Sequence, residues 1–219
     1  MDWAPQFLRA KTTFRSLSVD HIEGYFETMS TFRSEDKPQI LSGDIVNSLR
    51  GYDTTNLFRE YYAKANTSDP LSRIQYVDIK TYLTDDILTK VDRASMANSL
   101  EVRCPLLDHR LMEMVASMPS NLKLRGTTGK YPFKKAVESD LPNSIVHRSK
   151  MGFGIPVASW FRNGIRDYAR SYILERHDPY LSSPFIEKIW NQHQSGARDR
   201  SSQLWSVLMF RLWLDQYPV

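Results

Sequence analysis

The sequence is poor in cysteine and in glycine. Among its 219 residues there are one cysteine, Cys104, and 9 glycines. A single cysteine excludes an internal disulfide framework and a cysteine-rich zinc site, and it is typical of proteins from a reducing compartment. Gly-Gly and Asp-Gly pairs, which favour tight hairpins, are missing, so the pattern does not indicate strands joined by short turns. We therefore predict a cytoplasmic protein in which helices predominate.

Hydrophobic runs of membrane-spanning length are missing as well. The most apolar stretch, residues 204–214, is short and is interrupted by Arg211. Residues 1–5 have neither the basic nor the apolar region of a signal peptide. The 29 Lys and Arg are scattered among 25 Asp and Glu without a basic block, whereas nucleic-acid-binding proteins usually gather their cations on one face. We therefore expect neither a membrane nor a nucleic acid as a partner.

Several common catalytic signatures do not occur. The sequence lacks the phosphate-binding pattern GxxxxGK[ST], the dinucleotide pattern GxGxxG, the nucleophile pattern GxSxG and the zinc pattern HExxH. Its five histidines are dispersed, and each is expected at the surface or at a helix end rather than on a metal. No metal site is predicted, and a self-contained hydrolase or metalloenzyme is not favoured.

Apolar residues recur at intervals of three and four, which is typical of amphipathic helices. Pro70 is expected in the first turn of one helix, where its missing N–H costs nothing. Thr84 and Asp85 are expected to cap the next helix, and Asp108 the one after it. The last helix is apolar nearly all round and is therefore predicted to be buried. The predicted helices lie within residues 14–33, 45–49, 57–62, 70–83, 86–98, 109–118, 133–137, 160–173, 184–190 and 203–216, with loops over residues 120–130 and 147–156.

Residues 82–109, YLTDDILTKVDRASMANSLEVRCPLLDH, concentrate charged side chains among apolar ones. A proline near the end of this segment prevents a helix from continuing, so Glu101 and Arg103 are expected on an extended or turning stretch. A carboxylate held in a partly buried turn can act as a general base or orient an amine. The alternative is a structural ion-pair network that ties two helices together and comprises Glu101, Arg103, Asp92 and Arg93. The residues alone leave both interpretations open.

A second candidate site is the loop HRSKMGFGIP, residues 147–156. Lys150 is followed there by two glycines, Gly152 and Gly154, which favour a mobile loop. A lysine on such a loop can close over a phosphorylated intermediate and stabilise the charge that develops on it.

The run DILTKVDRASMANSLEVRCPLLDHRL closely resembles a pattern in the C-terminal synthetase domain of glutamine-hydrolysing asparagine synthetases. That pattern is a helix ending in Asp-Arg, a Met-Ala pair, and then Glu-x-Arg-x-Pro-hydrophobic-Leu-Asp. The resemblance is specific over residues 71–161 and looser on both sides. The later landmarks that resemble the family are Gly129-Lys130, Leu141-Pro142 with Ile145, Arg148-x-Lys150 with Gly152-Phe153, and the Trp160-Phe161 helix.

The resemblance implies a fold and an activity. The expected fold class is mainly α, the helical C-terminal portion of an α/β synthetase domain of the adenine-nucleotide α-hydrolase-like (ATP-pyrophosphatase) type whose sheet strands are missing here. In that family ATP activates aspartate as a β-aspartyl-adenylate. Ammonia released from glutamine then attacks this intermediate and gives asparagine, AMP and pyrophosphate.

Carried over by position, the resemblance also implies site residues. Glu101 would be an active-site carboxylate. Lys150 would bind the nucleotide and neutralise charge in the adenylate-forming and amide-forming transition states. Asp92 and Arg103 would orient Glu101, and Arg148 is assigned a supporting role.

Two further residues are placed by the same comparison. Lys130 has a supporting role in which it faces either the nucleotide or the solvent, and the sequence leaves these two open. Cys104 stands where the family commonly has a small apolar residue, so it is expected in the core rather than as a nucleophile.

The sequence also departs from the family pattern. The N-terminal catalytic cysteine, the Ser-Gly-Gly-x-Asp-Ser pyrophosphate loop and the Gly-Ala-Asp-Glu-like magnesium segment are not found in these residues. We therefore expect residues 1–219 to be a single helical unit, the C-terminal fragment of a synthetase domain, separated from its glutaminase domain and nucleotide-binding sheet and inactive alone. ATP and Mg²⁺ would act in the intact parent, neither binding tightly to the fragment. A homodimer is left open.

Alternatives from the same and from other classes remain. An amidotransferase of the same family could act on a sugar or a cell-surface precursor, because segments absent here help to choose the acceptor. A helical interaction or nucleic-acid-binding module is a different class, and it would need a basic face along one helix. A scaffold left by gene truncation would instead expose an apolar surface where the missing sheet should dock.

Overall fold

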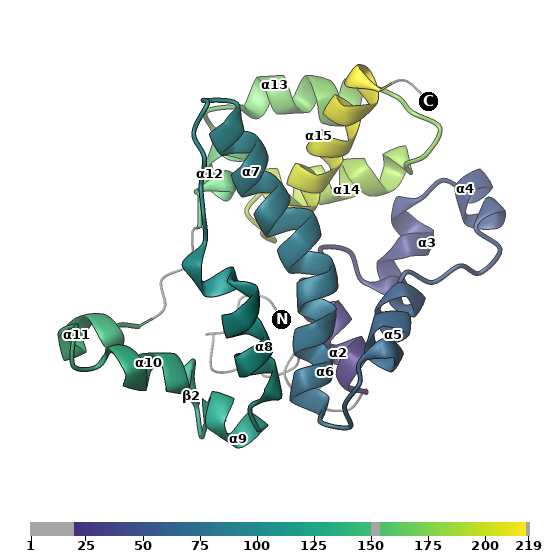
Figure 1. The fold of residues 1–219 in the computed structure, drawn as a ribbon. Helices are drawn as coiled ribbons and strands as arrows, with labels where there is room; N and C mark the ends of the chain where they lie inside the picture. Colours follow the sequence, from purple (N-terminus) through teal and green to yellow (C-terminus); the bar gives the residue numbers. More distant parts are fainter. Residues whose placement is uncertain (1–19, 150–153, 218–219) are drawn as a thin grey trace. The chain divides into compact units, whose positions relative to one another are not determined.

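The computed structural model describes residues 20–149 and 154–217 and divides into two compact units (Figure 1). Unit 1 contains the described residues up to 54 and from 154 onward, and unit 2 contains those from 55 to 149. Both units are built mainly of helices, as the sequence predicts. That residues 1–219 form a single helical unit stays a prediction, because two compact units can belong to one domain.

Unit 1 consists of helices from the N-terminal and the C-terminal parts of the chain. A lone antiparallel bridge between Leu41 and Leu181 joins these two parts, and the Ser42 hydroxyl donates to Pro179 O at 2.6 Å beside it. The elements of unit 1 are α2 (His21–Met29), η2 (Ser34–Asp36), α3 (Lys37–Ile40), α4 (Gly43–Ser48), α12 (Val157–Arg162), α13 (Arg166–Arg170), η5 (Ser171–Glu175), α14 (Ser183–Gln194) and α15 (Ser201–Gln216).

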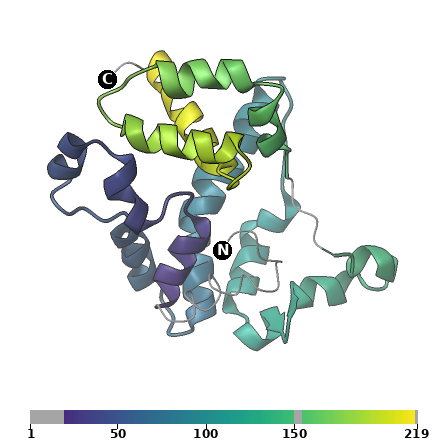
Figure 2. The same cartoon turned by 180° about the vertical axis from the view of Figure 1, so that it is seen from behind.

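The hydrophobic core of unit 1 lies between α12, η5, α14 and α15, which pack against one another. Figure 2 shows α14 and α15 side by side from behind, as Figure 1 does from the front. The core side chains are Ile40, Phe161, Ala169, Ile173, Ile186, Ile189, Trp190, Leu204, Val207 and Leu208. Fully burying an aliphatic or aromatic side chain contributes about 1.5–3 kcal/mol, so this cluster stabilises unit 1.

The last helix, α15, is less completely buried than its sequence suggests. Leu204 and Leu208 are buried, but Trp213 is 46% exposed and Met209 is 38% exposed. The buried face includes Arg211, which is only 3% exposed. The prediction of burial all round was therefore wrong for part of the helix, because one face of α15 packs on the core and the opposite face does not.

Unit 2 is organised by one long helix. Its consecutive segments are α6 (Pro70–Asp78), the π-helix η3 (Ile79–Leu88) and α7 (Thr89–Met96). The remaining elements of unit 2 are α5 (Thr55–Lys64), η4 (Pro105–Leu107), α8 (His109–Ser117), α9 (Ser120–Lys123), β1 (Leu124–Arg125), β2 (Thr128–Gly129), α10 (Tyr131–Val137) and α11 (Asn143–Val146).

Two predicted helix starts in unit 2 are confirmed and one is wrong. Asp69 caps α6 by accepting from Ser72 N at 2.7 Å, with Pro70 in the first turn. Asp108 caps α8 by accepting from Arg110 N at 3.0 Å. Thr84 and Asp85 do not cap a helix, because the chain continues through η3 without a break. A threonine inside a helix can instead bond a backbone carbonyl of its own helix.

A short hairpin forms where the sequence predicts only a loop. Strands β1 and β2 pair antiparallel, with Leu124 opposite Gly129 and Arg125 opposite Thr128. Gly126 in the turn has φ +59°, a conformation that glycine adopts without steric cost. The hairpin therefore needs neither a Gly-Gly nor an Asp-Gly pair.

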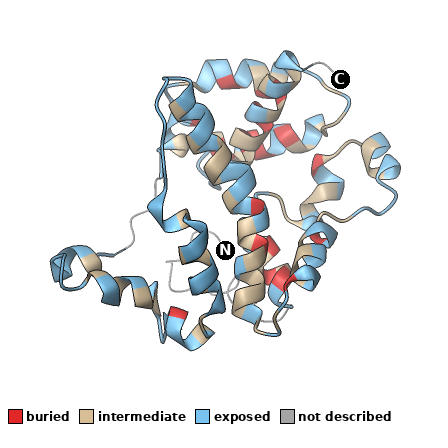
Figure 3. Ribbon diagram, in the orientation of Figure 1, coloured by how far each residue is buried: buried red, intermediate tan, exposed pale blue. Residues whose placement is uncertain are grey.

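Many apolar side chains of unit 2 are exposed, and Figure 3 shows α7 and α8 largely in the exposed colour. Leu100 and Ile145 are each 58% exposed and Met96 is 56% exposed.

None of the described helices has the length and apolar character that a bilayer span requires.

Candidate functional site

The long helix ends at Met96, and a turn separates it from the predicted catalytic carboxylate of Glu101. Ser99 has φ +55°, while Ser99 N donates to Met96 O at 2.9 Å and Leu100 N to Ser95 O at 3.0 Å. These two bonds and the left-handed residue form a Schellman motif, which satisfies carbonyls of the last turn. The motif fixes the direction in which the chain leaves α7, and Glu101 is the second residue after the left-handed one.

Glu101 and Arg103 form a close ion pair. Arg103 Nε donates to Glu101 Oε1 at 2.7 Å. The Glu101 side chain is 69% exposed and the Arg103 side chain is 86% exposed. The expectation of a partly buried turn is therefore wrong, since no described element of unit 2 covers these two side chains. The predicted link between Arg103 and Glu101 is present.

The pair leaves part of the carboxylate open. Within the described residues, Arg103 is the only hydrogen-bond or ion-pair partner of the Glu101 side chain. Oε2 and the second lone pair of Oε1 can therefore accept hydrogen bonds from a substrate amine or from water. An exposed pair such as this contributes little to stability, about 0–1 kcal/mol.

The structural network that the sequence left open is not formed. Asp92 and Arg93 are exposed on α7, and across the described ranges neither side chain is bonded to Glu101 or Arg103. Glu101 and Arg103 are two residues apart on one segment, so their bond ties no helices together. An orienting role of Asp92 toward Glu101 has no direct contact to support it.

The other predicted site residues lie on different segments. Lys130 is exposed at the start of α10 with φ +56°, and Arg148 is exposed after α11. Residues 20–149 show no hydrogen bond or ion pair between Glu101 and either cation. Lys150 lies outside the described residues. The structure thus brings together Glu101 and Arg103 of the predicted set, and the site roles themselves stay predictions.

Cys104 is not a core residue. The structure places it exposed, three residues after Glu101. The small apolar side chain that the family has at this position suggested burial, but no other described element of unit 2 covers the extended backbone between Leu100 and Pro105 closely enough to bury Cys104. This prediction was wrong.

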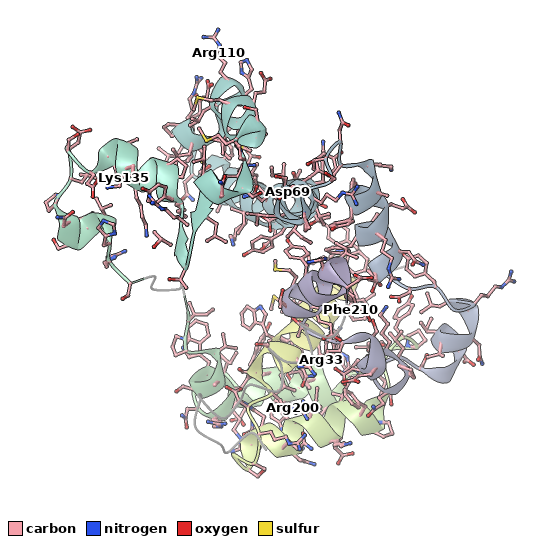
Figure 4. The ribbon with its side chains drawn as sticks, turned by 90° about the horizontal axis from the view of Figure 1, so that it is seen from below. Arg33, Asp69, Arg110, Lys135, Arg200 and Phe210 are labelled. Atoms are coloured by element: carbon pink, nitrogen blue, oxygen red, sulfur yellow. The ribbon has the colours of Figure 1, made fainter. Side chains whose placement is uncertain are left out.

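A polar cluster in unit 2 was missed by the sequence analysis. The Asp69 carboxylate, labelled in Figure 4, accepts from Ser72 N and from the Ser120 hydroxyl, which joins α6 to α9. The Ser120 bond, followed by the Ser72 bonds, lowers the pKa of Asp69. Lys123 is 7% exposed, and its Nζ donates to Ala116 O at 3.2 Å and to Ser72 Oγ at 3.3 Å. Nothing in SNLKLRG distinguishes this lysine from a surface lysine.

One histidine also differs from its expected place. His193 is 0% exposed in unit 1, where Nε2 lies 3.2 Å from Ala158 O and Arg200 N donates to Nδ1 at 3.2 Å. Burial lowers the pKa of His193. Its neutral form, with the proton on Nε2, satisfies both bonds, so this side chain is a structural residue of the core.

The described residues do not provide a magnesium site by themselves. No group of three His, Cys, Asp or Glu side chains gathers within residues 20–149 and 154–217. Glu101 supplies a single carboxylate whose Oε1 is already engaged by Arg103. Mg²⁺ is usually held by one or two carboxylates together with substrate phosphates and water, so Glu101 could supply one ligand of the ion but not a complete site.

Comparisons with known proteins place the chain in a family. A sequence model of the family described as asparagine synthase matches residues 2–215. Asparagine synthetase [glutamine-hydrolyzing] 1 of Bacillus subtilis is 30% identical over 210 residues, which are 95% of this chain and 33% of that protein. A putative asparagine synthetase [glutamine-hydrolyzing] of Mycobacterium bovis is 30% identical over 211 residues, 95% of this chain and 32% of that protein.

Other relatives carry other names. The amidase chyE of Penicillium rubens is 28% identical over 142 residues, which are 62% of this chain and 20% of that protein. No solved structure matches the chain. The chain spans about a third of the length of the first two curated relatives named. Since the family model matches nearly all of the sequence, this chain belongs to the asparagine synthase family.

Proposed function

We propose that this chain is part of an ATP-dependent amidotransferase that adenylates aspartate and transfers glutamine-derived ammonia to it. The fold that would carry this activity is an α/β synthetase domain of the adenine-nucleotide α-hydrolase-like type, of which these helices are the C-terminal portion. Family membership supports the reaction class. The amide-forming activity, its substrates and the inactivity of the chain alone are parts of the proposal.

The observation that carries the proposal is the placement of Glu101. Its carboxylate is exposed, is bonded at Oε1 by Arg103 and follows the Schellman motif that ends α7. A carboxylate held in this way can accept a hydrogen bond from ammonia and take a proton as the amide forms. Restricting the carboxylate by an ion pair also reduces the entropy that is lost when a substrate is bound.

The proposed chemistry has two balanced steps. An oxygen of the aspartate β-carboxylate attacks the α-phosphorus of ATP, and pyrophosphate leaves. The nitrogen of ammonia then attacks the activated carbonyl, AMP leaves and a proton passes to a base, for which we propose Glu101. Lys150 would stabilise the negative charge that develops on the phosphate in both steps. The described residues contain no group of three carboxylate, imidazole or thiol ligands, and no step is assigned to Mg²⁺.

ATP–pyrophosphate exchange tests the proposal. The gene product that contains these residues is purified as its source cell makes it and is incubated with ATP and labelled pyrophosphate. We expect label to enter ATP when aspartate is added, because adenylation is reversible. The absence of aspartate-dependent exchange, with glutamate and a buffer blank as comparisons, would reject aspartate as the substrate.

A different acceptor within the same family is the second candidate. The observation that favours it is that the relatives include chyE, which is named as an amidase. Exchange that depends on another carboxylate, and not on aspartate, would support this alternative.

A cytoplasmic location remains a prediction that rests on the single cysteine.

A further inference from the structure

The middle of the long helix in unit 2 has an unusual hydrogen-bond register. Residues Ile79–Leu88 form a π-helix of 10 residues between α6 and α7. π-helical bonding is rare and appears mostly as single turns, frequently at functional sites. A stretch of this length therefore requires a local cause that favours bonding across five residues over bonding across four.

Two threonine hydroxyls bond carbonyls in the same register. The Thr84 hydroxyl donates to Ile79 O at 2.6 Å, and the Thr89 hydroxyl donates to Thr84 O at 2.9 Å. Both bonds span five residues, the same separation as the backbone bonds of a π-helix. A threonine in an α-helix usually bonds the carbonyl three or four residues earlier, as Thr81 does with Val77 O at 2.8 Å.

The start of the long helix is fastened to a neighbouring element. The Asp69 carboxylate bonds Ser72 N and the Ser120 hydroxyl, and thereby links the first turn of α6 to α9. Lys123 Nζ donates to Ser72 Oγ at 3.3 Å and to Gln75 Oε1 at 3.4 Å. Because these bonds hold α6 in place, a change of register within η3 moves α7 rather than α6.

The end of the long helix transmits that movement to Glu101. The Schellman motif at Ser99 fixes the outgoing chain relative to α7, and Glu101 comes after one further residue. Each residue turns an α-helix by about 100°. A shift of the hydrogen-bond register in η3 by one residue would therefore rotate α7 relative to α6 by about that angle. The direction of the Glu101 carboxylate relative to α6 therefore depends on the register of η3.

We propose that Thr84 and Thr89 are positioning residues, whose hydroxyl bonds hold η3 in its π-helical register and thereby set the place of the Glu101 carboxylate. The structural part of this inference stands on the contacts of unit 2 alone. Its link to a reaction rests on the proposed function, because it takes Glu101 as a catalytic group.

Cys104 makes the structural part measurable. It is the sole cysteine of the chain and it is exposed, so a spin label can be attached there in the full 219-residue chain. A second label goes on Ala63→Cys, at an exposed position of α5, which packs against α6. The distance between the two labels is measured by double electron–electron resonance.

Three sets of variants are compared with the doubly labelled parent. Thr84→Val with Thr89→Val removes both hydroxyls and keeps the branched shape. Thr84→Ser with Thr89→Ser keeps both hydroxyls. Thr81→Val removes a hydroxyl bond that spans four residues and serves as the matched control.

We expect the distance distribution of the valine double variant to shift or broaden by several ångström. A side-chain tip lies about 5–6 Å from the helix axis, so a rotation of about 100° moves it by more than its own distance from the axis. The serine variant and the Thr81→Val variant should give the parent distribution. A valine double variant that overlays on the parent overturns the proposal. If the double variant does not fold, as judged by circular dichroism, the two single valine variants are measured, and parent-like distributions in both overturn it.

Activity is a separate measurement on the unlabelled gene product. The valine double variant should reduce kcat for amide formation at least 10-fold, while KM for ATP changes less than 3-fold. The serine double variant keeps both hydroxyls and should therefore have the kcat of the parent. An unchanged kcat together with a shifted distance would reject the role in catalysis and retain the structural one. A parent without aspartate-dependent exchange would reject the proposed function and leave the distance result standing.

Discussion

Arg211 on α15 and Asp178 form a buried ion pair in unit 1, with Nε donating to Oδ2 at 2.8 Å. The two side chains are 3% and 8% exposed. Arg211 Nη1 also donates to Tyr172 O at 2.9 Å and to Ile173 O at 2.7 Å, both in the π-helix η5. One guanidinium therefore satisfies a carboxylate and two carbonyls that are removed from water.

Removing either partner should strongly destabilise unit 1. We expect Arg211→Met to lower the free energy of unfolding by about 3–5 kcal/mol, because it leaves the charge of a buried carboxylate without its counter-ion and leaves Asp178 Oδ2 and two carbonyls without their donor. Urea unfolding followed by the fluorescence of Trp190 and Trp205 measures this change. The combined Arg211→Met and Asp178→Asn variant should recover part of the loss.

The matched control is an exposed pair in the same part of the chain. Arg170 Nη1 lies 2.8 Å from Glu175 Oε1, with both side chains more than half exposed. Arg170→Met should cost less than about 1 kcal/mol. Equal losses for the two arginine variants would contradict the importance of burial.

The stability of unit 1 should depend on the protonation of His193. Burial lowers the pKa of this imidazole below its usual 6.5, and protonation of Nδ1 would break the bond from Arg200 N. The unfolded chain therefore binds a proton more readily than the folded chain. The stabilisation is complete above about pH 6.5 and is lost as the pH falls below that value toward the lowered pKa.

Urea unfolding at several pH values between 5 and 8 checks this expectation. His193→Gln should weaken the decline on the acid side, since glutamine does not titrate. His147→Gln is the control, because His147 is half exposed. A decline that is the same in the His193→Gln variant and in the parent would assign it to other groups.

The left-handed residue at the end of α7 offers a stabilising substitution. Ser99 has φ +55°, a conformation that costs a residue with a Cβ about 1–2 kcal/mol. Ser99→Gly should raise the free energy of unfolding by up to about 1 kcal/mol, the remainder being offset by the greater freedom of glycine in the unfolded chain. Thermal unfolding followed by circular dichroism measures the effect.

The control for that substitution lies on the same helix. Ala94 is exposed in the interior of α7, and Ala94→Gly should lower stability by about 1 kcal/mol. Changes of opposite sign in the free energy of unfolding at Ser99 and Ala94 would identify the left-handed conformation as the cause. A loss of stability in both variants would contradict it.

The catalytic proposal makes its own prediction. In the gene product that contains this chain, Glu101→Gln and Lys150→Ala should each reduce amide synthesis by about 10²–10⁴-fold, the usual effect of removing an acid–base group or a preorganised cation. Glutamine hydrolysis should remain largely intact. Amide synthesis and glutamate release are measured on the same preparations.

Two exposed residues provide matched controls. Glu113 on α8 and Lys188 on α14 are exposed, and Glu113→Gln and Lys188→Ala should leave both activities unchanged. Loss of synthesis and hydrolysis together in the Glu101→Gln variant would instead indicate a structural role.

Local sequence signals predicted much of unit 2 correctly. Pro70 in the first turn of α6 and Asp108 as the cap of α8 are found as expected, because a helix start depends on residues that are neighbours in sequence. The bond from Arg103 to Glu101 is local for the same reason. The break expected at Thr84 was wrong, since the two threonine hydroxyls bond carbonyls of the same helix.

The sequence by itself determined the family, through the run from 86 to 111, and the helical character, through spacing and caps. Only the tertiary structure decided which polar residues are buried. Arg211, Lys123 and His193 look like surface residues in the sequence, yet each meets its bonding partners on other elements. The exposure of Glu101 and Cys104 was likewise decided by the absence of a covering element among the described residues of unit 2. Burial depends on contacts between residues distant in sequence, whereas caps and helical spacing depend on residues a few positions apart.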